Sequence, residues 1–118
     1  MSSSISLATN LNTAIRVDGS GQKTEASLLN NKIAKFSFSS SDIQLSEETS
    51  VPSGTTTVLN GTDYHWMLSY RSSTHTLWIL GTSDSDMGLS IKVYPIDMDQ
   101  SDIYLQKDTS GDLVLTVV

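Results

Sequence analysis

The sequence of 118 residues contains no cysteine. Disulfide bonds and thiolate metal sites are therefore excluded, and the stability of the fold has to come from packing. No stretch approaches the ~18–20 apolar residues of a membrane-spanning helix. The start of the chain, MSSSISLA, lacks the basic residues and the apolar run of a signal peptide. We therefore expect a soluble protein, in the cytoplasm or carried in a virion, with no membrane partner.

Positive charge is scarce. Seven lysines and arginines stand against thirteen aspartates and glutamates, which gives a net charge of −6. Such a surface repels phosphate backbones and releases few counterions, so nucleic acid is not an expected partner.

Motifs of catalysis are also absent. The chain has no Gly-x-Ser-x-Gly elbow, no glycine-rich phosphate loop and no dinucleotide fingerprint. The acidic residues fall mostly in turns, where little shields them from water and raises a carboxyl pKa. We therefore expect a protein that is not an enzyme and holds no cofactor.

Aromatic residues are concentrated in one stretch. Residues 64–80 hold both tryptophans, both histidines and two of the four tyrosines. Two β-prone runs flank the polar segment 71–74, which predicts a β-hairpin. The expected register pairs Tyr70 with His75, Leu68 with Leu77 and Trp66 with Ile79.

Alternation along the two strands divides this hairpin into two faces. The face that we expect in the core carries Tyr64, Trp66, Leu68, Tyr70, Leu77 and Ile79. The opposite face is also apolar in part, so either another sheet of the domain covers it or it forms an interface. It carries His65, Met67, Ser69, Thr76, Trp78 and Leu80.

A second hairpin is expected near the end of the chain. Residues 103–107 and 113–118 flank the five-residue loop 108–112. This loop length pairs Leu105 with Leu115 and Ile103 with Val117, which gathers the large aliphatic side chains on one face.

The remaining segments are short and strand-like. Residues 13–17 predict a strand that runs into a turn at 18–21, and residues 23–29 suit either a strand or a single helical turn. Further predictions are a strand at 32–39 with Ala34, Phe36 and Phe38 on one face, a crossover loop at 47–54, a strand at 55–59, a reverse turn at Asn60-Gly61, a polar loop at 81–86, and a strand that Pro95 closes.

About 8–10 short strands separated by turns indicate an all-β, antiparallel fold. The two alternatives are a β-sandwich, for which a jelly roll is one arrangement, and a small β-barrel. Residues 1–10 suit a flexible N-terminal arm or a first strand, and residues 11–118 are expected to form a single β domain.

Metal binding has two candidate sources. The favoured pairing places His65 and His75 on opposite faces of the sheet, so they are not expected to share an ion. The acidic loops offer carboxylates of the kind that calcium prefers, but aspartate is also the commonest turn residue and neither loop matches an EF-hand. Ordinary turn chemistry is the favoured explanation, and the weak calcium candidates are Asp84, Asp86, Asp97, Asp99 and Asp102.

Two classes of function fit these observations. The first is a structural or assembly protein that acts through protein contacts or self-association, such as a capsid-decoration or tail component of a virus particle. The alternative is a lectin-like module that stacks a glycan on Tyr64, Trp78 or Tyr104, with Asp63, Asp102 and Gln106 as hydrogen-bonding neighbours. The residues expected at an interface or ligand site are His65, Met67, Trp78, Leu80 and Tyr104.

Overall fold

A computed structural model of the chain describes residues 3–8, 11–39, 42–83, 91–98 and 102–118. This part of the chain contains eleven strands and no helix. The strands are β1 (Ser4–Leu7), β2 (Thr13–Val17), β3 (Lys23–Ser27), β4 (Ile33–Phe38), β5 (Ile43–Glu48), β6 (Thr55–Leu59), β7 (Tyr64–Arg71), β8 (Thr76–Ser83), β9 (Ile91–Asp97), β10 (Asp102–Lys107) and β11 (Leu113–Val117).

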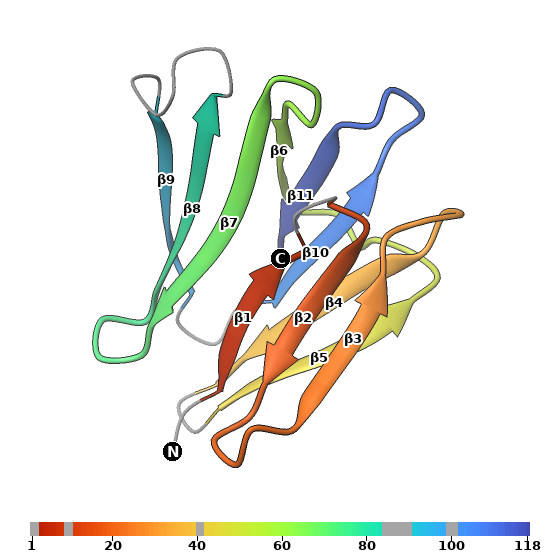
Figure 1. Cartoon of the computed structure of the whole chain (residues 1–118). Coiled ribbons are helices and arrows are strands. Elements are labelled where there is room, and N and C mark those ends of the chain that lie inside the picture. The colour runs from red at the N-terminus through yellow and green to blue at the C-terminus, as the bar shows by residue number, and fades with distance from the viewer. Residues whose placement is uncertain (1–2, 9–10, 40–41, 84–90, 99–101) are drawn as a thin grey trace.

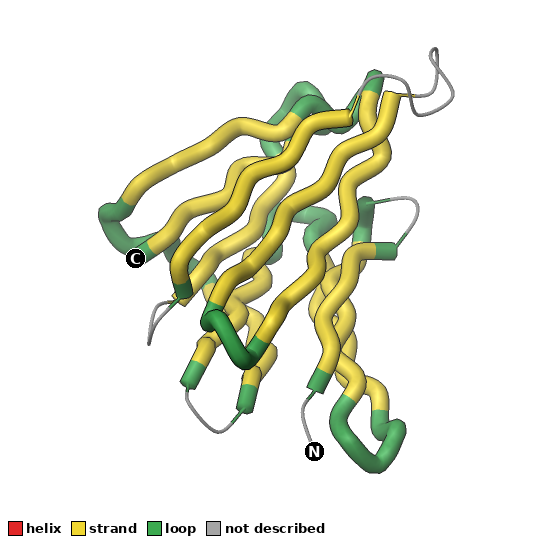
Figure 2. Tube along the Cα trace, turned by 90° about the vertical axis from the view of Figure 1, so that its left-hand side faces the viewer, coloured by secondary structure: helices red, strands yellow, loops and turns green. Residues whose placement is uncertain are grey.

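The strands form three antiparallel sheets arranged in two layers (Figure 1). The back layer is a five-stranded sheet in the order β5-β4-β10-β11-β6. The front layer holds the sheets β1-β2-β3 and β7-β8-β9, with β1 alongside β7. Figure 2, turned by 90°, shows that most of the described chain is strand and that loops and turns join the strand ends. The predicted all-β antiparallel fold is confirmed, and of the two alternatives left open the layers correspond to a β-sandwich. The described residues contain eleven strands where we expected eight to ten.

The core lies between the two layers. Every strand of the back sheet contributes at least one fully buried side chain, including Ile43 on the edge strand β5 and Leu59 on the edge strand β6, and β8 contributes Leu77 and Ile79 at 0% exposure. The predicted alternation in β4 is confirmed, because Ala34, Phe36 and Phe38 are all buried. The ring of Phe38 meets that of Tyr70 on β7 at 4.9 Å between centroids, so aromatic contact joins the layers directly.

Two hairpin loops have the same hydrogen-bonding pattern and the same position for a glycine. The loops that begin at Asp18 and Asp108 read Asp-Gly-Ser-Gly-Gln and Asp-Thr-Ser-Gly-Asp. In each, the aspartate carboxylate accepts hydrogen bonds from the backbone two and four residues later, and the glycine has a positive φ, 90° at Gly21 and 85° at Gly111. The aspartate closes the turn and the glycine supplies its left-handed residue. The predicted turn at 18–21 is therefore confirmed.

The predicted second hairpin is confirmed in register. Leu105 pairs with Leu115 and Ile103 pairs with Val117 around the loop 108–112. All four side chains lie on the core side of the back sheet, and the first three residues have 0% exposure. The strands predicted at 13–17 and 55–59 are confirmed as well.

The register predicted for the first hairpin is wrong by two residues. Leu68 pairs with Ile79, and Tyr70 pairs with Leu77. The cause is the loop, because residues 72–75 form the turn and His75 takes a positive φ of 50°, so it is not a strand residue. Since a shift of two preserves the alternation, the predicted core face is still the buried one.

The shifted register places Trp66 opposite Gly81. A Cβ added to Gly81 would lie on the six-membered ring of Trp66, 2.6 and 2.8 Å from its Cε3 and Cη2 atoms. The indole N–H donates a hydrogen bond to the backbone carbonyl of Asn60 at 2.5 Å. Trp66 is only 4% exposed, and its burial is worth up to about 4–6 kcal/mol before conformational entropy is counted.

The predicted turn at Asn60-Gly61 is present, but it joins β6 in the back layer to β7 in the front layer. The Asn60 side-chain oxygen accepts hydrogen bonds from the amides of Thr62 at 2.9 Å and Asp63 at 2.7 Å. The Gly61 amide donates to the Asp112 carboxylate at 2.9 Å. The turn between β6 and β7, which precedes Trp66, is therefore hydrogen-bonded to the loop of the second hairpin.

Several other expectations are settled by the described strands. Ser4–Leu7 forms β1 and pairs with β2, so a first strand replaces the alternative of a flexible arm there. Residues 23–27 form a strand and not a helical turn. The crossover loop is confirmed over residues 49–54, where it links β5 and β6 at opposite edges of one sheet, while residues 47 and 48 belong to β5. Two predictions are wrong: β8 continues through residues 81–83, and β9 continues past Pro95, which an edge strand tolerates.

The contact between Trp66 and Gly81 generates the first test. Gly81→Ala would force a methyl group into the indole ring, and overpacking of this kind costs about 1–3 kcal/mol of unfolding free energy. Urea denaturation measures the loss. Ser69→Ala, an exposed position on the same hairpin, should change stability by less than about 0.5 kcal/mol. Equal stability of Gly81→Ala and the parent protein would exclude the contact.

Candidate functional site

Four of the five residues predicted at an interface lie together on one surface. We call it the outer hairpin face; it is the side of β7 and β8 that points away from the back sheet. Met67 pairs with Leu80, Trp78 pairs with Ser69, and His65 follows on the same side of β7. The face consists of His65, Met67, Ser69 and Arg71 on β7 and Thr76, Trp78, Leu80 and Thr82 on β8.

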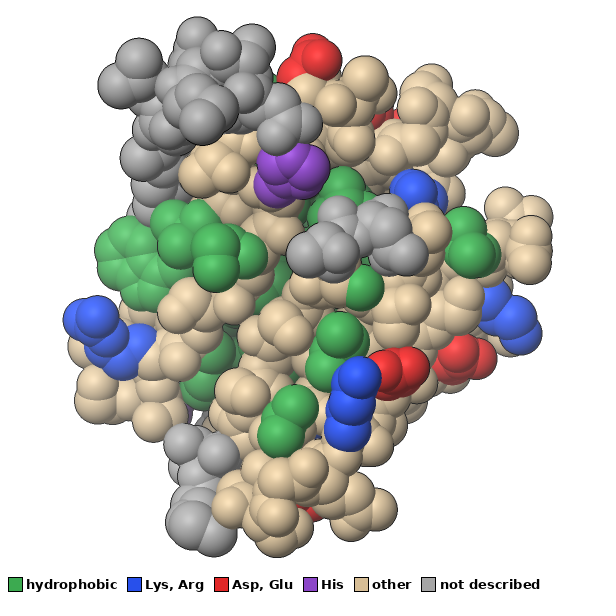
Figure 3. All heavy atoms as spheres, in the orientation of Figure 1, with side chains coloured by type: hydrophobic (Ala, Val, Ile, Leu, Met, Phe, Trp, Pro, Cys, Tyr) green, Lys and Arg blue, Asp and Glu red, His purple; other side chains and the backbone are tan. Residues whose placement is uncertain are grey.

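The outer hairpin face is open to solvent. Met67 is 54% exposed, which makes it one of the most exposed large apolar side chains in the described residues. His65 is exposed, while Trp78 and Leu80 are half-buried. No described strand lies over this face, and Figure 3 shows apolar side chains gathered on the same half of the front layer. Of the two alternatives, cover by another described sheet is therefore excluded.

Tyr104 lies elsewhere. It belongs to β10 at the centre of the back sheet, points away from the core, and is only 7% exposed. The Lys35 Nζ atom sits 5.7 Å from its ring centroid, and Lys35 also pairs with Asp102 at 3.6 Å. The charge of Asp102, followed by the contact with Tyr104, raises the pKa of Lys35. Tyr104 and the other four residues therefore occupy opposite layers and form no common site.

A groove of about 500 Å³ borders the outer hairpin face. Ser6 and Leu7 of β1 form one wall, residues 65–68 of β7 form the other, and Thr82 of β8 also contributes. Here the edges of two sheets lie side by side without forming one continuous ladder. Sequence reasoning missed Ser6, Leu7 and Thr82, because their proximity depends on β1 meeting β7, and no local pattern predicts that.

Trp78 combines an apolar surface with an unused donor. Its Nε1 atom is buried and has no hydrogen-bond partner within the described part of the chain. With Ser69, Arg71 and Leu80, Trp78 lines a shallow hollow of about 320 Å³. Burying a polar group without a partner costs free energy, so this donor lowers the stability of the described fold.

The two histidines lie in different places and do not form a shared metal site. His65 lies on the outer hairpin face, while His75 lies in the turn, where its carbonyl accepts a hydrogen bond from the Met98 amide at 2.7 Å. Among the described residues, no three histidine or acidic side chains are grouped to hold a metal ion. Of the calcium candidates, Asp97 and Asp102 belong to the ends of β9 and β10. Asp84, Asp86 and Asp99 lie outside the described residues, so calcium binding stays a prediction.

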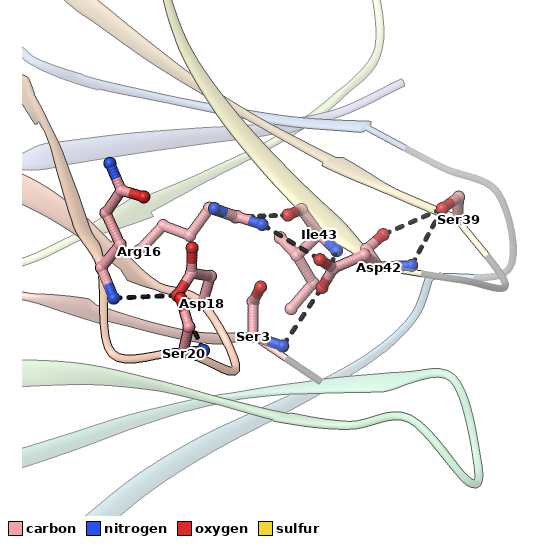
Figure 4. A network of polar contacts seen from close by, with 8 residues as sticks. Ser3, Arg16, Asp18, Ser20, Ser39, Asp42 and Ile43 are labelled. Carbon is pink, nitrogen blue, oxygen red and sulfur yellow. Dashed lines mark hydrogen bonds and ion pairs between the residues drawn. The ribbon is translucent and has the colours of Figure 1, made fainter. Parts of the chain in front are cut away.

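A polar cluster missed by the sequence reasoning joins the two layers (Figure 4). Arg16 on β2 is largely buried and donates from Nε to the Ile43 carbonyl at 2.6 Å and from Nη2 to the Asp42 carboxylate at 3.0 Å. The same carboxylate accepts hydrogen bonds from the amides of Ser3 at 3.1 Å and Ile43 at 2.8 Å. Each of these groups is satisfied by another group of the fold, which indicates a structural role.

Burial of Asp42 raises the pKa of its carboxyl group, but hydrogen bonds from Ile43 and Ser3 and the charge of Arg16 lower it by more. The pKa of Asp42 therefore lies below its ordinary value. A carboxyl group whose pKa is lower in the folded chain stabilises the fold above the unfolded value of ~3.9, and this contribution disappears as the pH falls through the folded pKa.

Asp42→Asn should therefore be less stable than the parent protein by about 1–3 kcal/mol near neutral pH, with the difference shrinking in acid below about pH 4. Urea denaturation at a series of pH values measures it. Glu25→Gln removes the exposed partner of Lys23 and should have an effect of less than about 1 kcal/mol. A difference for Asp42→Asn that stays constant from pH 7 to strong acid would contradict this assignment.

The described residues contain no helix with the length and apolar character needed to cross a membrane. Comparison with models of protein families, with curated proteins and with solved structures gave no match to this chain.

Proposed function

We propose that this protein is a non-enzymatic assembly or binding domain that docks onto another protein through the outer hairpin face. The observation that carries the proposal is the 54% exposure of Met67 beside the half-buried Trp78 and Leu80. Methionine and tryptophan are enriched in protein interfaces and sparse on surfaces that only meet water. Burying one such side chain contributes about 1.5–3 kcal/mol.

The charge of the outer hairpin face supports a protein partner. The chain has a net charge of −6, yet the eight residues of this face include Arg71 and His65 and no carboxylate; the carboxylate that borders it in the described residues is Asp97 of β9, which pairs with Thr76. A partner with an apolar centre and an acidic rim would meet complementary charge here and repulsion over much of the remaining surface.

The core residues beneath the outer hairpin face favour binding without rearrangement. Trp66 and Leu68 alternate with the exposed residues of β7 and are each 4% exposed in the core. The exposed side chains therefore stand on a packed hairpin, which lowers the entropy cost of association. The composition, a small cysteine-free β domain rich in serine and threonine, leads us to favour the protein shell of a particle such as a virion as the partner.

Met67→Ser tests the proposal, with Leu29→Ser as the matched control because Leu29 is 45% exposed in a turn away from this face. Immobilised parent protein and both variants are exposed to an extract of the native source. A partner should be retained by the parent and by Leu29→Ser and lost or weakened at least about tenfold with Met67→Ser. Equal retention by both variants, with unchanged circular dichroism, would refute docking at this face.

Glycan binding is the second candidate, supported by the hollow in which Trp78 lies beside Ser69 and Arg71. A sugar ring stacked on the indole would be held by polar neighbours of this kind. Titration with a glycan panel should then change tryptophan fluorescence, and Trp78→Ser should abolish the change. If the fluorescence of the parent protein ignores every glycan while protein capture depends on Met67, the lectin alternative is wrong.

A further inference from the structure

The outer edges of the two layers are protected by different devices, with one exception. An unprotected edge strand presents free N–H and C=O groups that can pair with another chain. On β3 the edge is charged, with Lys23 and Glu25 joined at 2.6 Å. On β9 the sequence places Pro95, which lacks the N–H group needed for pairing.

The free edge of β5 is covered by the front layer. Arg16 donates to the Ile43 carbonyl at 2.6 Å. Near the other end of the strand, the Glu47 side chain turns toward β3 and accepts a hydrogen bond from the Ser27 amide at 3.0 Å. Strands β2 and β3 of the front layer therefore lie against β5 and obstruct its pairing with a further strand.

The exception is β6, the opposite edge of the back sheet (Figure 1). Its sequence, Thr-Thr-Thr-Val-Leu, has no charge and no proline and consists mostly of β-branched residues. Thr55, Thr56 and Val58 are exposed, and Val58 is 59% exposed. In the described structure, the backbone of β6 pairs with β11 and with no strand on its other side.

We propose that β6 pairs antiparallel with β6 of a second copy of this chain, joining two five-stranded sheets into one. One register pairs all five residues of the strand, the one in which Thr57 faces its own copy. Thr56 then faces Val58 of the second copy, and Thr55 faces Leu59. Every pair is apolar or threonine, and such cross-strand pairs are favourable.

A second copy is favoured over an unrelated strand because the uncharged sequence of β6 is complementary to itself across a two-fold axis. Each copy carries a net charge of −6, so most surfaces of two copies repel each other. The five residues of β6 carry no charge, and a two-fold axis through Thr57 brings no like charges face to face within the strand pair. The two-fold axis also matches each free donor on one strand with an acceptor on the other. This contact does not depend on the outer hairpin face.

Sedimentation velocity over a range of concentrations tests the pairing. The parent protein should approach twice its monomer mass of 12.8 kDa. In the double variant Thr56→Lys and Val58→Lys, lysine faces lysine at both pairs that Thr56 and Val58 form between the two copies. This variant should raise the dimer dissociation constant about tenfold or more. The combination Thr56→Lys with Val58→Glu sets lysine against glutamate and should restore the dimer.

Met67→Ser serves as the control, because it should leave the dimer intact whether or not the outer hairpin face binds a partner. Circular dichroism and thermal melting confirm that each variant is folded. The proposal is overturned if the parent protein is a monomer at all concentrations, if the double lysine variant dimerises as tightly as the parent, or if Met67→Ser alone abolishes the dimer. Failure of the lysine–glutamate variant to restore the dimer would overturn the Thr57-centred register.

Discussion

The packing of Trp66 against Gly81 is the contact on which the arrangement of the front layer depends. It fixes the register of β7 and β8, because the indole ring has room opposite a glycine and none opposite a residue with a Cβ. Its N–H group is satisfied by the Asn60 carbonyl, at the end of the strand that comes from the back layer. One side chain therefore joins the hairpin pairing, the connection between layers and the core.

The outer hairpin face follows from this arrangement. With Trp66 and Leu68 held in the core, alternation requires that Met67 point outward, where it meets Leu80 across the strand pair. The same layer leaves β1 beside β7 without a continuous ladder, and the resulting groove extends the apolar surface. Conversely, the β6 edge is open because the chain crosses to the front layer directly after Leu59. The two proposed contact surfaces therefore lie on different layers and can act independently.

What the sequence could predict was set by local chemistry. The register of β10 and β11 was predictable because the loop Asp108–Asp112 contains a glycine for its left-handed residue and an aspartate that closes the turn. The loop of the first hairpin has no glycine, and His75 takes that conformation without a clear sequence signal, which explains the error of two residues. The faces were still predicted correctly, because alternation has a period of two. Tyr104, the groove and the Arg16–Asp42 cluster depend on which strands become neighbours, and a single sequence does not determine that.

The chemical shift of the Gly81 α-protons tests the central contact most directly. A proton held over the face of an indole ring is shifted strongly upfield by the ring current, and replacing Trp66 with leucine would remove that shift. We predict one Gly81 α-proton well upfield of its position in an unfolded chain, together with backbone NOEs that connect Leu68 with Ile79. An ordinary glycine shift, or NOEs that connect Leu68 with Leu77, would contradict the register and the face that it exposes.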